Sequence, residues 1–165
     1  MIVAELADRV RDRHADVVVA RGEATVVVDR SELLETLRAL RDDPELELDA
    51  LASVTATDWP GREPRFWVSY ELSSGRHHHR LRVKVGVPED DPGVPTVTEL
   101  FPTADWHERE VFDLYGIVFD GHPDLRRILL PEGWEGYPLR KTEELGGVDT
   151  RYKGAFIPPV DRRTT

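Results

Sequence analysis

The sequence predicts an α+β fold: a two-layer domain over residues 1–119, in which helices pack on a mainly antiparallel mixed sheet, followed by an extended C-terminal arm over residues 120–165. Strand-like and helix-like segments alternate through the first part, and tight turns join neighbouring strand segments. The regular periodicity stops near Asp120, and the rest is rich in Pro, Gly, Trp and paired charges. A chain of 165 residues is also long enough to bury a core without disulfide or metal crosslinks.

The first elements are a helix and a hairpin. Apolar residues recur at helical spacing, which predicts an amphipathic helix over residues 3–13. Two β-branched runs, at residues 17–19 and 25–28, are separated by Arg21-Gly22-Glu23, a sequence typical of a hairpin turn.

A second helix and a third strand follow. Ser31 is a suitable N-cap for a helix whose leucines share one face over residues 33–40, and Asp42-Asp43-Pro44 ends it. The composition of residues 51–57 predicts the third strand.

The clearest strand pair comes next. Residues 65–72 and 79–87 are joined by a turn at Ser73-Ser74-Gly75, and in the second of them apolar and polar residues alternate with the period of a half-buried antiparallel strand. Helical character returns over residues 103–115, and Gly116 stands at the C-cap position.

Charge and composition exclude several classes of function. The net charge of −10 argues against nucleic acid or anionic lipid as a partner, because both require a basic surface. The charge is uneven: residues 1–120 carry 14 Lys and Arg against 25 Asp and Glu, whereas residues 121–165 carry 8 against 7. The chain contains no Cys, so it cannot ligate an iron–sulfur cluster or run thiol chemistry.

The motifs of membrane insertion, secretion and phosphate binding are also missing. No window approaches 18 consecutive apolar residues, and charges interrupt the N-terminal apolar positions where a secretory signal needs an unbroken run. The glycine-rich phosphate loops, the nucleophile elbow and the zinc-protease motif are absent. We therefore expect a protein kept in the cytoplasm that reaches a membrane only through its partners.

His77-His78-His79 is the first candidate metal cluster. Neighbouring side chains in a strand point to opposite faces, so only His77 and His79 could share a metal ion. Motifs this short produce many false matches, and we favour a solvated start to an edge strand over a metal site.

The helix over residues 103–115 carries the second candidate site. His107, Glu110 and Asp113 fall at helical spacing, so a carboxylate–imidazole metal site is geometrically possible, but a salt-bridged surface explains them as well. Glu108, Glu110 and Asp113 could also do general acid–base work. Because no nucleophile or phosphate motif accompanies them, we expect no catalytic residue here.

The start of the arm combines features of a protein interface. Pro123 holds its neighbourhood extended, and Arg126 and Arg127 offer planar forks suited to carboxylates across an interface. Apolar anchors of the kind that dominate interfaces follow at Leu129, Leu130, Trp134 and Tyr137. We expect the arm to gain its order by lying on another surface.

A long motif runs from the acidic helix into the arm: Glu108–Ile117, Phe119, Gly121–Leu129 and Gly136–Lys141. In this motif the chain resembles the C-type subunit family of the respiratory NADH–quinone oxidoreductase (complex I), the 30-kDa-type subunit. Leu51–Trp59 is similar to an earlier Thr-x-x-Asp-aromatic segment of that family, and Thr142 departs from the family where an acidic residue is usual.

The resemblance implies a structural subunit of the hydrophilic arm of that complex, peripheral to the cell membrane on its cytoplasmic side and without a cofactor or metal of its own. FMN and iron–sulfur clusters in partner subunits would carry electrons from NADH to quinone, coupled to ion translocation. The arm would lie on the D-type subunit, the 49-kDa type. The partner-binding residues expected from the signature are Glu108, Glu110, His122, Asp124, Arg126, Arg127, Arg140 and Lys141.

Two alternatives stay open at this point. The chain could be the equivalent subunit of a related membrane-bound hydrogenase or of a dehydrogenase fed by ferredoxin or a deazaflavin, because other chains decide where electrons enter. It could instead be a stand-alone metal-dependent hydrolase using His107, Glu110 and His122, which predicts bound metal and activity in the isolated protein.

Overall fold

The structure is a computed structural model, and it describes residues 3–11 and 16–143. Within these ranges three helices and seven strands follow one another, with a short 3-10 turn between the second strand and the second helix. In chain order they are α1 (Val3–Arg11), β1 (Val17–Ala20), β2 (Glu23–Val28), the 3-10 turn η1 (Arg30–Glu32), α2 (Leu33–Asp42), β3 (Ala50–Asp58), β4 (Phe66–Ser73), β5 (Arg80–Val87), β6 (Gly93–Pro95), α3 (Ala104–Tyr115) and β7 (Val118–Asp120).

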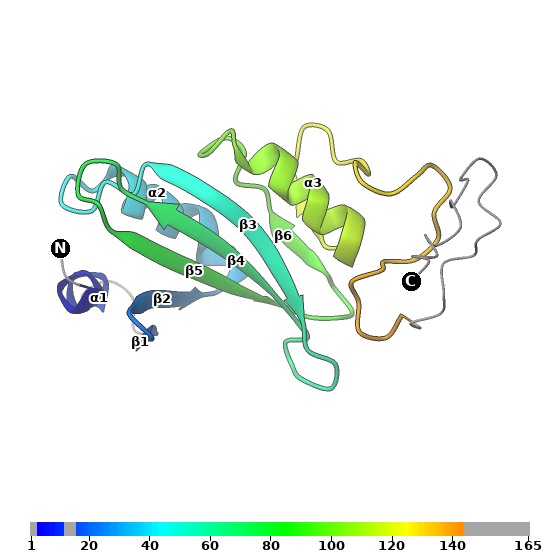
Figure 1. The fold of residues 1–165 in the computed structure, drawn as a ribbon, viewed down its shortest axis with the longest axis horizontal. Helices are drawn as coiled ribbons and strands as arrows, with labels where there is room; N and C mark the ends of the chain where they lie inside the picture. The colour runs from blue at the N-terminus through cyan, green and yellow to red at the C-terminus, as the bar shows by residue number, and fades with distance from the viewer. Residues whose placement is uncertain (1–2, 12–15, 144–165) are drawn as a thin grey trace, which may run out of the picture.

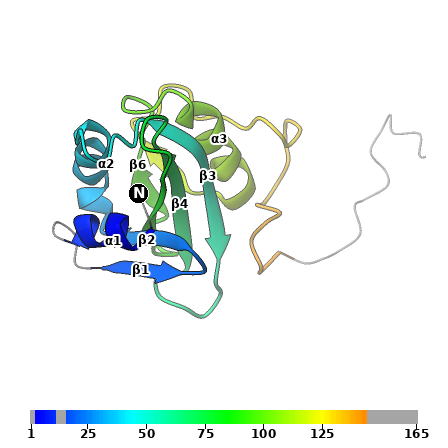
Figure 2. The same cartoon turned by 60° about the vertical axis from the view of Figure 1, so that its left-hand side comes forward.

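Five of the strands form one mixed sheet in the order β1-β2-β5-β4-β3. Three of its four pairings are antiparallel, and β2 pairs with β5 in parallel. Figures 1 and 2 show the helices α1 and α2 gathered beside one part of this sheet and α3 lying along β3. The predicted α+β class and the mainly antiparallel mixed sheet are confirmed.

The core forms on one face of the sheet because buried and polar residues alternate in matched register. Val68 pairs with Val85 and Tyr70 with Val83, and all four side chains are buried. Residues on the other face, such as Arg82 of β5, are partly exposed. Burying each such aliphatic side chain contributes about 1.5–3 kcal/mol, so the register is strongly specified.

Two local predictions differ from the structure. Ser31 is not the N-cap of α2: it lies inside η1, and the N-cap position is taken by Glu32, which makes no capping hydrogen bond through its side chain. The second difference is the parallel pair of β6 and β7, which the sequence did not predict because three-residue strands are too short to show a period.

The segment that follows β7 contains no helix or strand over residues 121–143, and we call it the arm segment. It runs back beside α3, as the yellow-to-orange part of Figure 1 shows. The rest of the predicted arm, residues 144–165, lies outside the described residues. No helix within the described ranges has the length and apolar character needed to cross a membrane.

Candidate functional site

Asp113 of α3 is the main attachment point of the arm segment. Its side chain is fully buried, and its Oδ2 accepts hydrogen bonds from the main-chain N–H groups of Ile128, Leu129 and Leu130 at 3.0, 2.7 and 2.9 Å. Its Oδ1 lies 3.1 Å from Nη1 of Arg127. Burial alone raises the pKa of a carboxyl, but the three amide donors and the Arg127 charge outweigh it, and the pKa of Asp113 lies below its ordinary value. Asp113 is therefore a buried anion.

Asp58, at the end of β3, holds the far end of the arm segment. Arg65 binds it through two hydrogen bonds of 2.7 and 2.9 Å, and the main-chain N–H of Lys141 donates to Oδ2 at 2.7 Å. Arg65 also donates to Oγ1 of Thr142 at 3.1 Å. The hydrogen bonds from Arg65 lower the pKa of Asp58, burial opposes them, and the Lys141 amide adds to the lowering.

Between these two anchors the arm segment packs on the C-terminal end of α3. Leu139 N–H donates to the carbonyl oxygen of Leu114, and Nε of Arg140 donates to that of Tyr115 at 2.6 Å. The Arg140 guanidinium stands 4.5 Å from the ring centroid of Tyr137. Gly116 ends α3 at φ +70, as predicted, and a Cβ added there would lie 2.5 Å from Tyr137 Cε2. The missing side chain at Gly116 thus allows Tyr137 of the arm segment to pack against the end of the helix.

A second buried carboxyl, Glu108, lies where α3 meets the loop after β6. It accepts hydrogen bonds from Oγ1 of Thr96 at 2.5 Å and from the N–H of Val97 at 2.8 Å. Burial raises its pKa to about 7 despite these donors, and the charge of Asp105 adds to the rise. His122 Nε2 lies 3.9 Å from Glu108 Oε2, and the His122 side chain is also fully buried. Glu108 and His122 are therefore internal groups in this conformation, and a partner cannot touch their side chains.

Four of the expected partner-binding residues lie at the surface: Glu110, Asp124, Arg126 and Lys141 are exposed. Arg126 pairs with its neighbour Asp124 at 3.0 Å, and that pair leaves both side chains more than half exposed. Their contact with a partner stays a prediction.

Arg127 and Arg140 are partly buried, because they hold the arm segment to α3. We expected the arm to gain order from another surface. For residues 121–143 the structure differs: buried acceptors of the chain's own domain, Asp113 and Asp58, already hold the main chain.

Large apolar side chains of the arm segment nevertheless face solvent. Leu129, Trp134 and Leu139 are 58%, 40% and 42% exposed. Trp106 of α3 is exposed as well and carries the Arg109 guanidinium over its ring, 4.8 Å from the centroid. Tryptophan and arginine side chains are enriched at protein interfaces, and the exposed leucines add apolar area beside them.

The histidine run has a structural role that the sequence interpretation missed. A solvated start to an edge strand is wrong, since β5 is flanked by β2 and β4 and His79 is buried. Nε2 of His79 lies 2.7 Å from the carbonyl oxygen of Leu46, and its ring stacks on that of His77 with centroids 5.6 Å apart. Burial lowers the pKa of His79, so this residue fastens the loop before β3 as a neutral group.

The structure contradicts the hydrolase hypothesis, which requires His107, Glu110 and His122 to bind one metal ion. Both ring nitrogens of His122 have main-chain partners: Nε2 lies 3.2 Å from the Asp105 carbonyl oxygen, and Nδ1 accepts the N–H of Asp124 at 3.0 Å. Within the described ranges, no three His, Asp or Glu residues are grouped so that they could hold a metal ion. His107 and Glu110 therefore do not form a metal site with His122.

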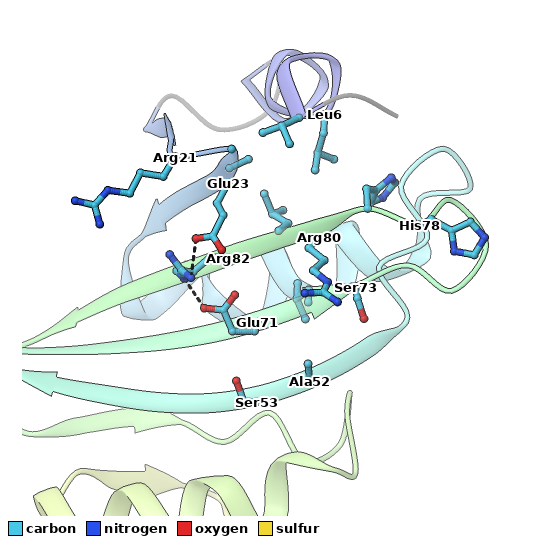
Figure 3. A pocket seen from close by; sticks show the side chains of 16 residues that line it. Leu6, Arg21, Glu23, Ala52, Ser53, Glu71, Ser73, His78, Arg80 and Arg82 are labelled. Carbon is cyan, nitrogen blue, oxygen red and sulfur yellow. Dashed lines mark hydrogen bonds and ion pairs between the residues drawn. The ribbon is translucent and has the colours of Figure 1, made fainter.

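A cavity of about 700 Å³ lies at the other end of the molecule, between α1 and the strands near the β1–β2 turn. Figure 3 shows Glu23 and Glu71 turned toward Arg82 on its floor, and both pair with that guanidinium. Two carboxylates thus share one guanidinium, and both ion pairs are made within the chain. None of the residues that line the cavity belongs to the arm segment.

Comparisons with known proteins agree on one family. The family described as "Respiratory-chain NADH dehydrogenase, 30 Kd subunit" matches residues 26–149. A protein of Saccharopolyspora erythraea, named as the C-type subunit of NADH-quinone oxidoreductase, is 51% identical over 148 residues, which cover 89% of this chain and 59% of that protein. The protein of the same name from Mycolicibacterium gilvum is 47% identical over 150 residues, covering 89% of this chain and 66% of its own length. The chain thus spans about three fifths to two thirds of these relatives.

Solved structures give the same fold. A trypsin-resistant fragment (1-134) of Nqo5 is 34% identical and superposes with a TM-score of 0.66, covering 76% of this chain and all of that fragment. A chain of an archaeal membrane-bound sulfane sulfur reductase superposes with a TM-score of 0.73 over 86% of this chain and 85% of its own. Its identity of 24% shows a shared fold alone.

Proposed function

The chain belongs to the family of the 30 kDa subunit of respiratory-chain NADH dehydrogenase, and on that premise we propose that it is a structural subunit of an NADH–quinone oxidoreductase. Its contribution is architectural. Electrons pass from NADH through FMN and iron–sulfur clusters in partner subunits to quinone, and their transfer drives ion translocation.

The observation that carries this proposal is the arm segment. Its main chain is held on α3 by Asp113, while Leu129, Trp134 and Leu139 present apolar surface to solvent. Three large apolar side chains exposed within eleven residues of one segment suit the core of a protein interface. The arm segment is the docking surface in this proposal, and its partner is the 49-kDa-type (D-type) subunit.

The same proposal gives the chain's location. It lies in the hydrophilic arm of the complex, on the cytoplasmic side of the cell membrane, and it is peripheral to the membrane. The acidic surface of residues 1–120 supports attachment through protein partners, because anionic lipid repels it.

The experiment is a native purification from the source organism. The chain carries an affinity tag, membranes are solubilised gently, and the eluate is assayed for NADH-driven quinone reduction and for co-purifying subunits by mass spectrometry. We expect a large assembly that contains flavin, iron–sulfur subunits and the 49-kDa-type subunit.

The alternative outcomes are distinct. A large assembly that ignores NADH and accepts electrons from ferredoxin or a deazaflavin assigns the chain to a related membrane complex. Recovery of the chain alone, with no co-purifying subunit, contradicts the proposal.

A further inference from the structure

We propose that Asp113 and Asp58 are positioning residues for partner binding: two buried carboxylates that hold residues 127–142 as a docking surface formed before the partner arrives. This inference rests on the proposed function and names the residues that prepare its interface. Neither carboxylate touches the partner in this proposal, since both side chains are fully buried.

Asp113 fixes the arm segment through three consecutive main-chain donors. The N–H groups of Ile128, Leu129 and Leu130 converge on one oxygen atom, an arrangement that neither a helix nor a strand provides. Without this acceptor the three partly buried N–H groups would lose their hydrogen-bond partner within the protein. The turn around the carboxylate would then open so that water could bind them. The conformation of this stretch therefore depends on one charge.

Asp58 fixes the other end by the same means. Its Oδ2 is shared by the Arg65 guanidinium, at 2.9 Å, and by the main-chain N–H of Lys141, at 2.7 Å. The Arg65 side chain is 5% exposed and that of Asp58 is fully buried, so the ion pair that carries the acceptor lies inside the protein. The side chain of Lys141 takes no part in this bond, and the residue is exposed.

Asp113 and Asp58 bind the arm segment mainly through its main-chain N–H groups. This distinguishes a segment that is positioned for a partner from one that only stabilises the fold. A segment kept only for stability would bury its apolar side chains. Here the main-chain N–H of Leu129 donates to Asp113, whereas the residue is 58% exposed. Ordering a free segment costs conformational entropy, so a segment ordered in advance binds more tightly than one that must order on binding.

The first measurement is amide hydrogen exchange in the full chain carrying Asp113→Asn. Asparagine keeps the shape but removes the charge that holds three donors. We expect exchange at Ile128, Leu129 and Leu130 to rise on the order of tenfold or more, the size of a lost charged hydrogen bond, with no change in β4 and β5. The matched control is Glu99→Gln, an exposed carboxylate in the loop before α3, which should leave all protection unchanged.

If Asp113→Asn fails to fold, Leu129→Pro is measured instead, because it deletes one of the three donors from the arm side. Loss of protection throughout β4 and β5 in a folded variant, or no change at the amides of residues 128 and 130, overturns the inference.

The second measurement repeats the native purification with the same variant. We expect wild type to recover the NADH-active assembly and Asp113→Asn to recover it at least about tenfold less well. Equal recovery of both, with the arm loosened, overturns the positioning role and leaves the proposed function standing. Failure of wild type to recover partners contradicts the proposed function, while the exchange result still decides whether Asp113 orders the arm segment.

Discussion

Three fully buried carboxyl side chains illustrate how environment decides ionisation at the scale of single residues. Asp113 and Asp58 meet a guanidinium and main-chain donors, and the pKa of each lies below its ordinary value. Glu108 also accepts two hydrogen bonds, yet burial dominates and raises its pKa to about 7. Asp105 and Tyr70 interact with it electrostatically without neutralising it, and Nε2 of His122 lies 3.9 Å from its Oε2. The first two act as anions and Glu108 as a group that titrates near neutrality.

Glu108 makes stability depend on pH. Its folded pKa exceeds its ordinary value of 4.5, so its contribution is fully present below pH 4.5 and is lost as pH rises through about 7. Glu108→Gln, whose amide can serve both Thr96 and Val97, should recover up to about 3 kcal/mol at pH 8 and little at pH 4.5. Urea unfolding of both proteins at the two pH values measures this. Parallel pH profiles for wild type and variant would contradict the explanation.

At the scale of elements, α3 is the helix that organises the molecule, and its buried face carries charge. Glu108, Arg109 and Asp113 are buried beside Ala104 and Val111. A helical pattern assigns charged residues to the solvent face, so periodicity placed Glu108 and Asp113 at the surface. Only the folded loops, Thr96–Val97 and residues 127–130, supply the partners that allow these charges inside. The structural role of Glu108 and Asp113 could therefore not be predicted from the local sequence.

The predictable elements share a different property. β5 was predicted because apolar and polar residues alternate along it, β4 because a turn sequence joins it to β5, and α2 because its leucines recur on one face. Asp58 and Arg65 were missed, since a carboxylate at the end of a strand has no periodic signal. Asp58 and Arg65 pair because the hairpin brings the end of β3 next to the start of β4.

The end of α3 gives a prediction at this scale. Gly116→Ala places a Cβ at positive φ and 2.5 Å from the Tyr137 ring, and we expect a loss of about 1–3 kcal/mol together with trypsin cleavage after Arg140. Gly61→Ala is the matched control, since Gly61 has φ +76 and no atom within 4 Å of the added Cβ. It should lose about 1 kcal/mol without exposing Arg140. Thermal unfolding and limited proteolysis test both, and equal behaviour of the two variants would argue against the packing of Tyr137 on this glycine.

At the scale of the whole molecule, charge and exposed apolar surface are divided between two regions. Residues 1–120 hold the entire excess of acidic residues, whereas residues 121–165 carry one more basic than acidic residue. The arm segment carries three of the large apolar side chains that face solvent. Like charges on the acidic region oppose association of copies of the chain through that region, and in the proposed function association takes place through the arm segment.

The docking role of the arm segment is tested by Leu129→Gln. Because Leu129 is 58% exposed, we expect its replacement to change the free energy of unfolding by no more than about 0.5 kcal/mol. We expect recovery of the NADH-active assembly to fall at least about tenfold. Leu34→Gln, an exposed leucine of α2 on the acidic domain, is the control and should affect neither quantity. Unchanged recovery with Leu129→Gln would remove that side chain from the interface.

The strand order also dictates when the molecule can fold during its synthesis. β5 is the last of the five sheet strands to leave the ribosome, yet it lies in the middle, between β2 and β4. The β1–β2 hairpin and the β3–β4 hairpin therefore emerge as two separate pieces, and neither has a partner for its inner edge until residues 80–87 appear. The sheet is completed by insertion of its central strand, a pairing across more than fifty residues that makes closure late and cooperative. A nascent chain stalled before Arg80 holds two hairpins and no sheet.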